Sequence, residues 1–392
     1  MKSARRLRSF VTNALLLAGA VSLSYLLIGA AYLAFGPRLL PNLINYFPVT
    51  ATIWWQASAP HPEREPYVAL LGDSYASGMG DWRVERRDWR EPYHSADVIR
   101  ALTGKSVLSF GRSGAGSAEA IVSQPAEALD AARCLIFPQL RLPSELVVYF
   151  YEGNDLDNNI AYIEQVLSAS LDDPLLSQRI AEQLRTDYGV TSPATCLGYF
   201  ASALIGLVNT ALWTPDGELP VPAANEFLIG GQPMQMPGGL QGPSLELDQA
   251  GIAAALLVTD RSLEWLTTRL PGVPITVVLV PSVLTVYRPA APMVTAQIYW
   301  DSNGVHDADR VAVQSDLICA GLSAIVSRQG LRFLDARSAL RAAARDTLVH
   351  GPQDWRHFNR VGYTRLGETV AAVLSGTSVP EGCARLANAA AN

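Results

Sequence analysis

Short apolar runs alternate with helical stretches along most of this chain, and this alternation strongly constrains the fold. Val, Leu and Ile dominate five runs that we predict to be strands: Tyr67–Leu71, Ser106–Phe110, Glu145–Tyr151, Pro274–Val280 and Leu331–Asp335. We expect helices over Ser95–Leu102, Ala118–Ala132, Gln249–Leu270, Ala308–Gly330 and about Arg360–Leu374. Apolar strands that alternate with helices indicate an α/β fold, a three-layer sandwich whose central parallel sheet is covered by helices on both faces.

The alternation is interrupted between about residues 156 and 247, and we interpret this stretch as an insertion within a domain that spans residues 67–392. Residues from Ile160 to about Tyr188 have the pattern of an amphipathic helix. The apolar segment Leu197–Trp213 is short for a membrane span, so we expect a buried or interfacial helix there. Thr214–Pro243 is rich in Pro and Gly, which indicates a long surface excursion.

The amino-terminal segment has the composition of a membrane anchor. A basic tail, residues 1–9, precedes an uncharged run from Phe10 to Phe35 of about 26 residues, enough to cross a bilayer with some tilt. Because the small-residue cleavage site of a signal peptide is poorly matched, we expect an uncleaved transmembrane helix over residues 10–35, followed by a membrane-proximal linker over residues 36–66. Positive charge before the run places the amino end in the cytoplasm. The expected location is therefore the inner membrane, single-pass, with the domain on the periplasmic or extracytoplasmic side.

Composition and cysteine spacing narrow the functional classes. The net charge of −6 argues against nucleic acid as a partner. The four cysteines are widely separated and show no zinc-type spacing, so we expect no metal site. They suit disulfides in an oxidising compartment, and of the three pairings we prefer Cys134–Cys196 with Cys319–Cys383. The alternative is four buried free thiols in a reducing compartment.

Chemically versatile residues follow the predicted strands, at the edge of a parallel sheet where ligands bind. Gly72-Asp73-Ser74 follows the first strand, Gly111 to Gly116 the second, and Glu152-Gly153-Asn154-Asp155 the third, while Asp354 to Asn359 precedes the last helix. Together they supply a serine, backbone donors, an amide, a carboxylate and a histidine, the parts needed for acyl transfer through a covalent intermediate. Taken singly, each has a plainer explanation as a helix cap, turn or surface residue. For Asp354 that explanation is the N-cap of the last helix.

These four blocks, in this order, resemble the SGNH hydrolases, also called the GDSL esterase/lipase family, in a membrane-anchored bacterial form. The resemblance covers about Tyr67 to Leu374, the insertion excepted, and implies a flavodoxin-like sandwich with ester-hydrolase activity. It implies that Ser74 is the nucleophile and that Asp354 and His357, in Asp-x-x-His spacing, are the carboxylate and the base.

The same resemblance assigns three oxyanion donors: the N–H of Ser74, the N–H of Gly114 and the side-chain amide of Asn154. One position departs from the family, because Ser109 stands where an Asn is common. No metal and no organic cofactor is implied.

The expected substrate is an O-acetylated envelope or exopolysaccharide glycan, because a tethered domain outside the membrane meets such polymers. Trp82, Arg83 and Trp89 follow the nucleophile and are candidates for stacking on sugar rings or binding acidic sugars, although a solvated loop explains them equally well. Two alternatives remain: an O-acyltransferase that uses the same Ser-His-Asp site, and a non-catalytic glycan-binding or scaffold protein of envelope assembly. The expected partners are the ester substrate and the cytoplasmic membrane. The sequence identifies no protein partner.

Overall fold

A computed structural model describes residues 65–81, 94–131, 140–187, 223–299, 302–377 and 382–386, with a few isolated positions before residue 65. At its centre lies a parallel sheet of five strands in the order β10-β6-β3-β1-β2. Its strands are β1 (Tyr67–Leu71), β2 (Ser106–Ser109), β3 (Glu145–Tyr151), β6 (Ile275–Val280) and β10 (Arg332–Asp335). The predicted α/β fold with a central parallel sheet is confirmed. Because β1 lies between β2 and β3, the chain reverses its direction of winding at β1, where open parallel sheets bind ligands.

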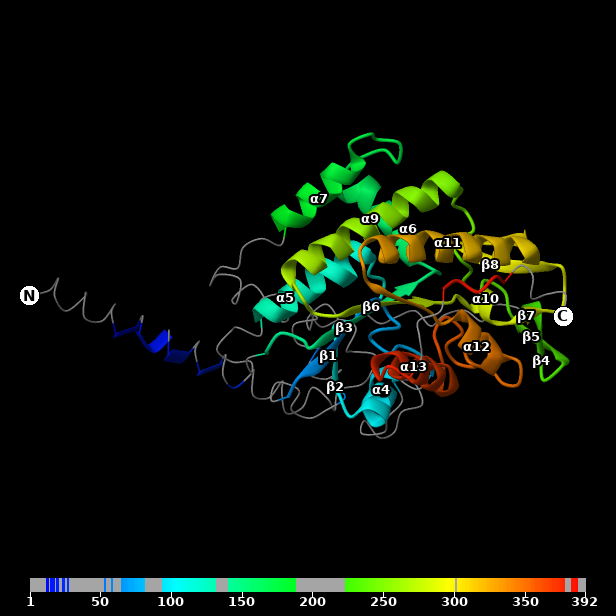
Figure 1. Ribbon diagram of the computed structural model, residues 1–392, viewed down its shortest axis with the longest axis horizontal. Helices are drawn as coiled ribbons and strands as arrows, with labels where there is room; N and C mark the ends of the chain where they lie inside the picture. The colour runs from blue at the N-terminus through cyan, green and yellow to red at the C-terminus, as the bar shows by residue number, and fades with distance from the viewer. Residues whose placement is uncertain are drawn as a thin grey trace, which may run out of the picture.

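Helices cover both faces of this sheet (Figure 1). One layer holds α4 (Ser95–Thr103), α12 (Arg337–Ala344) and α13 (Arg360–Leu374). The other holds α5 (Gln124–Ala131), α6 (Asp155–Ala161), α9 (Gln249–Arg269) and α11 (Ala308–Arg328), with α7 (Leu176–Asp187) outside α9. Side chains alternate along β1, so Val68 and Leu70 join the core under α4 and α13, while Ala69 and Leu71 join the core under α9 and α11.

Two smaller antiparallel pairings lie beyond the sheet. Strands β4 (Ala223–Ile229), β5 (Gln232–Pro237) and β7 (Arg288–Pro289) form one, and β8 (Met293–Tyr299) with β9 (Ser302–Asp307) forms the other; α10 (Val283–Val286) precedes β7. Within the predicted surface excursion over Thr214–Pro243, residues 223–237 form a regular hairpin of β4 and β5, and these strands were not predicted. Gly230 and Gly231, at φ +59° and +75°, form a tight hairpin turn, and Phe227 is fully buried.

The prediction of a single amphipathic helix from Ile160 to about Tyr188 is wrong. The described part of this stretch is divided into the end of α6, a π-helical turn η5 (Tyr162–Val166), an irregular stretch and α7. Ser168 has φ +48°, and Pro174 stands just before α7, so neither the backbone nor the sequence continues one helix through this stretch. A second π-helical segment, η4 (Ala118–Ser123), leads into α5 within the predicted helix Ala118–Ala132.

Parts of the sequence-based interpretation lie outside the described residues. These are Leu197–Trp213, Trp82, Arg83, Trp89, Cys134, Cys196 and most of residues 1–64. The domain boundaries and the extent of the insertion therefore stay predictions. Within the predicted anchor, the described positions are helical, and the side chains of Leu15, Leu16 and Leu17 are exposed. Among the described residues, one helix is long and apolar enough to cross a membrane; it is α11, which contributes Ile318 and Leu322 to the core.

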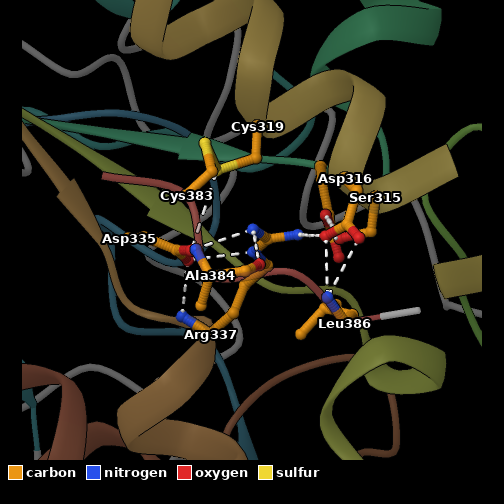
Figure 2. The surroundings of a disulfide bond; sticks show 9 residues. Ser315, Asp316, Cys319, Asp335, Arg337, Cys383, Ala384 and Leu386 are labelled. Carbon is orange, nitrogen blue, oxygen red and sulfur yellow. Dashed lines mark hydrogen bonds and ion pairs between the residues drawn. A yellow bond between two sulfur atoms is a disulfide. The ribbon is translucent and has the colours of Figure 1, made fainter. Parts of the chain in front are cut away.

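A disulfide joins Cys319 on α11 to Cys383 and fastens residues 382–386 to the domain (Figure 2). Beside it lies Arg337, whose side chain is fully buried. Its guanidinium contacts the Asp335 carboxylate at 2.8 and 2.9 Å and Asp316 Oδ1 at 3.0 Å. It also donates to the carbonyl of Ala384 at 2.9 Å, so the buried charge is paired and bonded in several directions.

Candidate active site

Ser74 lies in a tight turn directly after β1. The strand is followed by Gly72, whose φ is +146° and where an added Cβ would lie 2.9 Å from the carbonyl oxygen of Tyr149, so only glycine fits. The next residues form helical turns rather than a long helix: the Ser77 N–H donates to the Asp73 carbonyl at 3.1 Å and the Met79 N–H to the Ser74 carbonyl at 3.0 Å. The Ser74 hydroxyl donates to Asp73 Oδ2 at 3.2 Å. The candidate nucleophile is thus presented at the carboxyl edge of the sheet.

His357 and Asp354 lie on the loop between α12 and α13. The imidazole Nδ1 of His357 is 2.7 Å from Asp354 Oδ2. Asp354 does not cap α13, because the N-cap is Asn359, whose side chain accepts the N–H of Val361 at 2.9 Å. The cap explanation for Asp354 is therefore excluded. A carboxylate on Nδ1 holds the tautomer whose Nε2 can accept a proton.

Electrostatics keep Asp354 ionised. Burial acts to raise the pKa of Asp354, but the charge of His357 and hydrogen bonds from its ring and from two backbone N–H groups outweigh burial and lower the pKa to about 2. His350, seven residues before His357, lies in a different environment. It is fully buried, its Nδ1 is 3.2 Å from the hydroxyl of Tyr287, and burial lowers its pKa to about 3. Of the two histidines on this loop, His357 is the one whose ring contacts a carboxylate.

Tyr75 ties the serine turn to the histidine loop. Its hydroxyl donates to the carbonyl of Arg356 at 2.7 Å, and its ring packs edge-on against Phe358 with centroids 4.9 Å apart. The centroid of the same ring is 5.5 Å from that of His357. In a second hydrogen bond, the hydroxyl of Tyr363 donates to the carbonyl of Met79. Segments almost three hundred residues apart therefore form one packed unit.

Gly114 lies on the loop after β2, which is fastened to the same turn. The hydroxyl of Ser109 donates to the Ala76 carbonyl and accepts the Gly111 N–H at 3.1 Å. Ser109 thus anchors this loop at the position where the resembled family often has an Asn. Gly114 is exposed at φ +75°, and its N–H has no acceptor among the described residues. The backbone donor is free for a ligand.

Asn154 directly follows β3 and precedes α6. It holds the N-cap position of α6, but its side chain forms no capping bond. Its Oδ1 is buried and has no hydrogen-bond partner among the described residues. A buried amide oxygen without a hydrogen bond is uncommon. Asn154 stands beyond the carboxyl end of β3, which is the neighbour of β1 in the sheet.

Two buried carboxyls near Ser74 were missed as site residues by the sequence-based interpretation. Asp73 Oδ1 accepts the Tyr75 N–H at 2.9 Å, and Asp155 Oδ2 accepts the Tyr151 N–H at 3.0 Å. Burial raises the pKa of Asp73 to about 6, and burial followed by the charge of Asp73 raises the pKa of Asp155 well above its usual range. Asp73 was considered only as a cap, because sequence alone does not show that β1 and β3 are neighbours.

Glu152, two residues before Asn154, is held by a buried hydrogen-bond network. Its side chain is fully buried and accepts hydrogen bonds from the Ser282 N–H at 2.9 Å, the Ser282 hydroxyl at 3.0 Å and the Thr285 hydroxyl. The Ser315 hydroxyl donates to its other oxygen at 2.6 Å and accepts from Arg337 at 2.9 Å. The segment after β3 is thereby connected to the disulfide-bonded C-terminal residues. No signal in the sequence marks this network.

The arrangement brings the predicted residues to one edge of the sheet. Ser74, Gly114 and Asn154 follow three adjacent strands, and the Asp354–His357 pair packs against the serine turn through Tyr75. Among the residues that the structure describes, no cluster of three His, Cys, Asp or Glu side chains could hold a metal ion. A serine, a carboxylate-bound imidazole and unused amide donors are the parts required for nucleophilic acyl transfer.

Comparison with known proteins gives distant structural likenesses. No protein-family model matches the chain, and no curated protein matches it in sequence. An extracellular lipase from Streptomyces rimosus is similar over 80% of this chain and 100% of its own, at 14% identity and a TM-score of 0.39. A phospholipase A1 from Streptomyces albidoflavus is similar over 80% of this chain and 99% of its own, at 15% identity and a TM-score of 0.37. A carbohydrate acetylesterase from Sinorhizobium meliloti is similar over 80% of this chain and 100% of its own, at 11% identity and a TM-score of 0.33. Likenesses this distant assign no activity.

Proposed function

We propose that this chain is a serine-dependent acyl-ester hydrolase of the SGNH type that its sequence blocks resemble. The observation that carries this proposal is the 2.7 Å contact between Asp354 and His357, on a loop that Tyr75 fastens to the turn bearing Ser74. A catalytic triad needs an oriented base beside a serine, and here the histidine and the carboxylate are already paired.

The reaction begins when Ser74 Oγ attacks the ester carbonyl carbon. His357 Nε2 takes the hydroxyl proton as the O–C bond forms, and Asp354 holds Nδ1–H and stabilises the imidazolium. The Ser74 hydroxyl is hydrogen-bonded to Asp73 in this structure, so it turns toward His357 as the substrate binds. Such realignment is common, because catalytic hydrogen bonds often tighten only in the substrate complex.

The tetrahedral oxyanion is stabilised by the N–H groups of Ser74 and Gly114 and by the amide of Asn154. When the intermediate collapses, the C–O bond to the leaving alcohol breaks and His357 returns its proton to that alcohol. Water then attacks the acyl-serine with the same base, which releases the acid and restores Ser74. Each oxyanion donor contributes about 10²–10³ in rate.

The substrate that fits best is an O-acetylated glycan outside the cytoplasmic membrane. The uncharged run over residues 10–35 supports a membrane anchor, and the Cys319–Cys383 disulfide supports an oxidising compartment. An enzyme tethered there meets envelope and exported polysaccharides. Hydrolysis and transfer share the acyl-serine, so acetate release is to be measured with and without an oligosaccharide acceptor.

The test is turnover of p-nitrophenyl acetate by the purified chain and by Ser74→Ala. We expect the wild-type protein to release p-nitrophenol and acetate and the variant to fall to the uncatalysed rate while retaining its circular dichroism spectrum and melting temperature. Equal turnover by a folded Ser74→Ala variant would remove Ser74 from the mechanism and end the proposal.

A further inference from the structure

We propose that a cavity of about 210 Å³ beside Gly114 is a subsite for one neutral sugar ring of the substrate. This inference rests on the proposed function, because it identifies what the esterase binds next to Gly114, one of its oxyanion donors. The cavity lies between the loop after β2 and the segment that follows β3, and Gly114 itself is part of its wall. A ligand seated there reaches the candidate second oxyanion donor directly.

Small residues and two π-helical turns keep the cavity open. Ala118 begins η4 and Ala161 ends α6 just before η5, and both line the cavity. Gly116 lets the two walls approach, because an added Cβ would lie 2.9 Å from Asn158 Cβ and 3.0 Å from Asn159 Oδ1. Single π-helical turns inside helical segments occur frequently at functional sites. Two such turns on opposite walls of one cavity indicate a built site.

The chemistry of the lining favours hydroxyl groups over an acyl chain. Asn158, Gln165 and Glu119 line the cavity with amide and carboxylate groups. The Asn158 amide N–H donates to the carbonyl of Gly114 at 3.1 Å, which leaves its oxygen as an acceptor. Tyr162 adds an aromatic side chain to the wall. Donors and acceptors around a small cavity match the hydroxyl rim of a sugar, whereas a fatty acyl chain would leave them unpaired.

Size and charge narrow the ligand further. Pockets for drug-sized ligands usually hold about 300–1,000 Å³, so this smaller cavity fits one ring rather than an extended chain. Glu119 is the only charged side chain among the described residues that line it. A carboxylate there repels the carboxylate of a uronic acid. The structure therefore assigns the subsite to a neutral O-acetylated sugar.

The experiment compares kcat/KM on p-nitrophenyl acetate, on an acetylated neutral oligosaccharide and on an acetylated uronic-acid oligosaccharide. Ala161→Trp fills the cavity, and Gln165→Ala removes one amide. Glu164→Ala is the matched control, because Glu164 is exposed on the same turn η5 and does not line the cavity. Melting temperatures check that each variant is folded.

We expect Ala161→Trp to lower the ratio of neutral-sugar turnover to p-nitrophenyl acetate turnover at least about tenfold, which corresponds to about 1.4 kcal/mol. Gln165→Ala should lower the same ratio about threefold, which corresponds to about 0.65 kcal/mol. Glu119→Gln should raise turnover of the uronic-acid substrate relative to the neutral one. Glu164→Ala should change no ratio. Unchanged ratios in both Ala161→Trp and Gln165→Ala, or a wild-type preference for the uronic-acid ester, would overturn the subsite.

A binding measurement separates failure of the subsite from failure of the esterase. Titration calorimetry of the folded Ser74→Ala protein with the deacetylated neutral oligosaccharide needs no turnover. If the wild type hydrolyses no ester but the sugar binds and Ala161→Trp abolishes binding, the esterase proposal fails and the subsite stands. If the wild type hydrolyses p-nitrophenyl acetate but the sugar neither binds nor is deacetylated, the subsite fails and the esterase stands.

Discussion

The hydroxyl of Tyr75 donates a 2.7 Å hydrogen bond to the backbone carbonyl of Arg356, across 281 positions of the sequence. This bond joins the turn that carries Ser74 to the loop that carries His357. In the proposed mechanism, the reaction depends on the alignment of those two segments, and small misplacements of reacting groups can cost large factors in rate.

Tyr75→Phe keeps the ring packing and removes this bond. We expect kcat on p-nitrophenyl acetate to fall about 10- to 100-fold, and the free energy of unfolding to fall by about 1–2 kcal/mol. Tyr149→Phe is the control, because its buried hydroxyl donates to Ser95 Oγ at 3.0 Å on the helix α4 side of the sheet. It should lose similar stability and keep its kcat. Equal kcat losses in the two variants would show that Tyr75 has no special part in alignment.

Asn154→Ala separates catalysis from stability. The amide of Asn154 forms no hydrogen bond within the described fold, so we expect unfolding free energy to change little while kcat falls about 10²–10³-fold. Asn159→Ala is the comparison, because that amide contacts Ser117, Ala255 and Thr259 at 2.8–3.1 Å. It should destabilise the protein by about 1–3 kcal/mol. A stable Asn154→Ala variant with wild-type kcat would remove Asn154 from the oxyanion hole.

Asp73→Asn tests the buried carboxyl beside the nucleophile through the pH dependence of stability. Burial raises the pKa of Asp73 to about 6 in the folded protein, against about 3.9 in an unfolded chain. Between these values the folded state holds a proton that the unfolded state has lost, so stability falls as pH rises through this interval. Above pH 6, the free energy of unfolding of the variant should therefore exceed that of the wild type by about 1–3 kcal/mol. The difference should vanish near pH 4. Denaturant unfolding at several pH values measures it, and a difference independent of pH would contradict the account.

The double variant Cys319→Ser/Cys383→Ser tests the fastening of the C-terminal segment. Removal of a cross-link that closes a loop of 64 residues should lower the free energy of unfolding by about 2–4 kcal/mol. The double variant is preferable to a reducing agent, because it removes this cross-link alone. Because neither cysteine belongs to the proposed triad or to the oxyanion donors, kcat of the folded variant should stay within about twofold of wild type. Unchanged stability would contradict the fastening.

The central sheet could be predicted because its strands are buried on both faces. A run such as Ile275–Val280 is apolar at every position except Thr276, and the helices between such runs make the crossovers parallel. The hairpin over residues 223–237 was missed although Gly230-Gly231 is a recognised two-residue turn signal. The abundance of Pro and Gly around it obscured the short strands. Similarly, Pro174 marks the break that the predicted helix from Ile160 to Tyr188 ignored.

The candidate site was predictable for residues that directly follow a strand. It was not predictable for residues that come together only because two strands are neighbours in the sheet. The convergence of the carboxyl ends of parallel strands pointed to the blocks that contain Ser74, Gly114 and Asn154, and the family resemblance then assigned these three residues. The proximity of Asp73 and Asp155 follows from the pairing of β1 with β3, which the sequence does not contain in readable form. Arg337 is fully buried, against the usual exposure of arginine, and only its contacts with Asp335 and Asp316 explain it.

The most direct test of the central claim, that Ser74 is activated by His357, is intact-mass measurement after reaction with a fluorophosphonate. In that reaction Ser74 Oγ bonds to phosphorus, fluoride leaves, and the base takes the hydroxyl proton. We predict one phosphonyl adduct on the wild-type chain, located on the peptide containing Ser74, no adduct on Ser74→Ala, and labelling of His357→Ala slowed by about 10²-fold or more. An adduct on Ser74→Ala, or labelling of a folded His357→Ala variant at the wild-type rate, would contradict it.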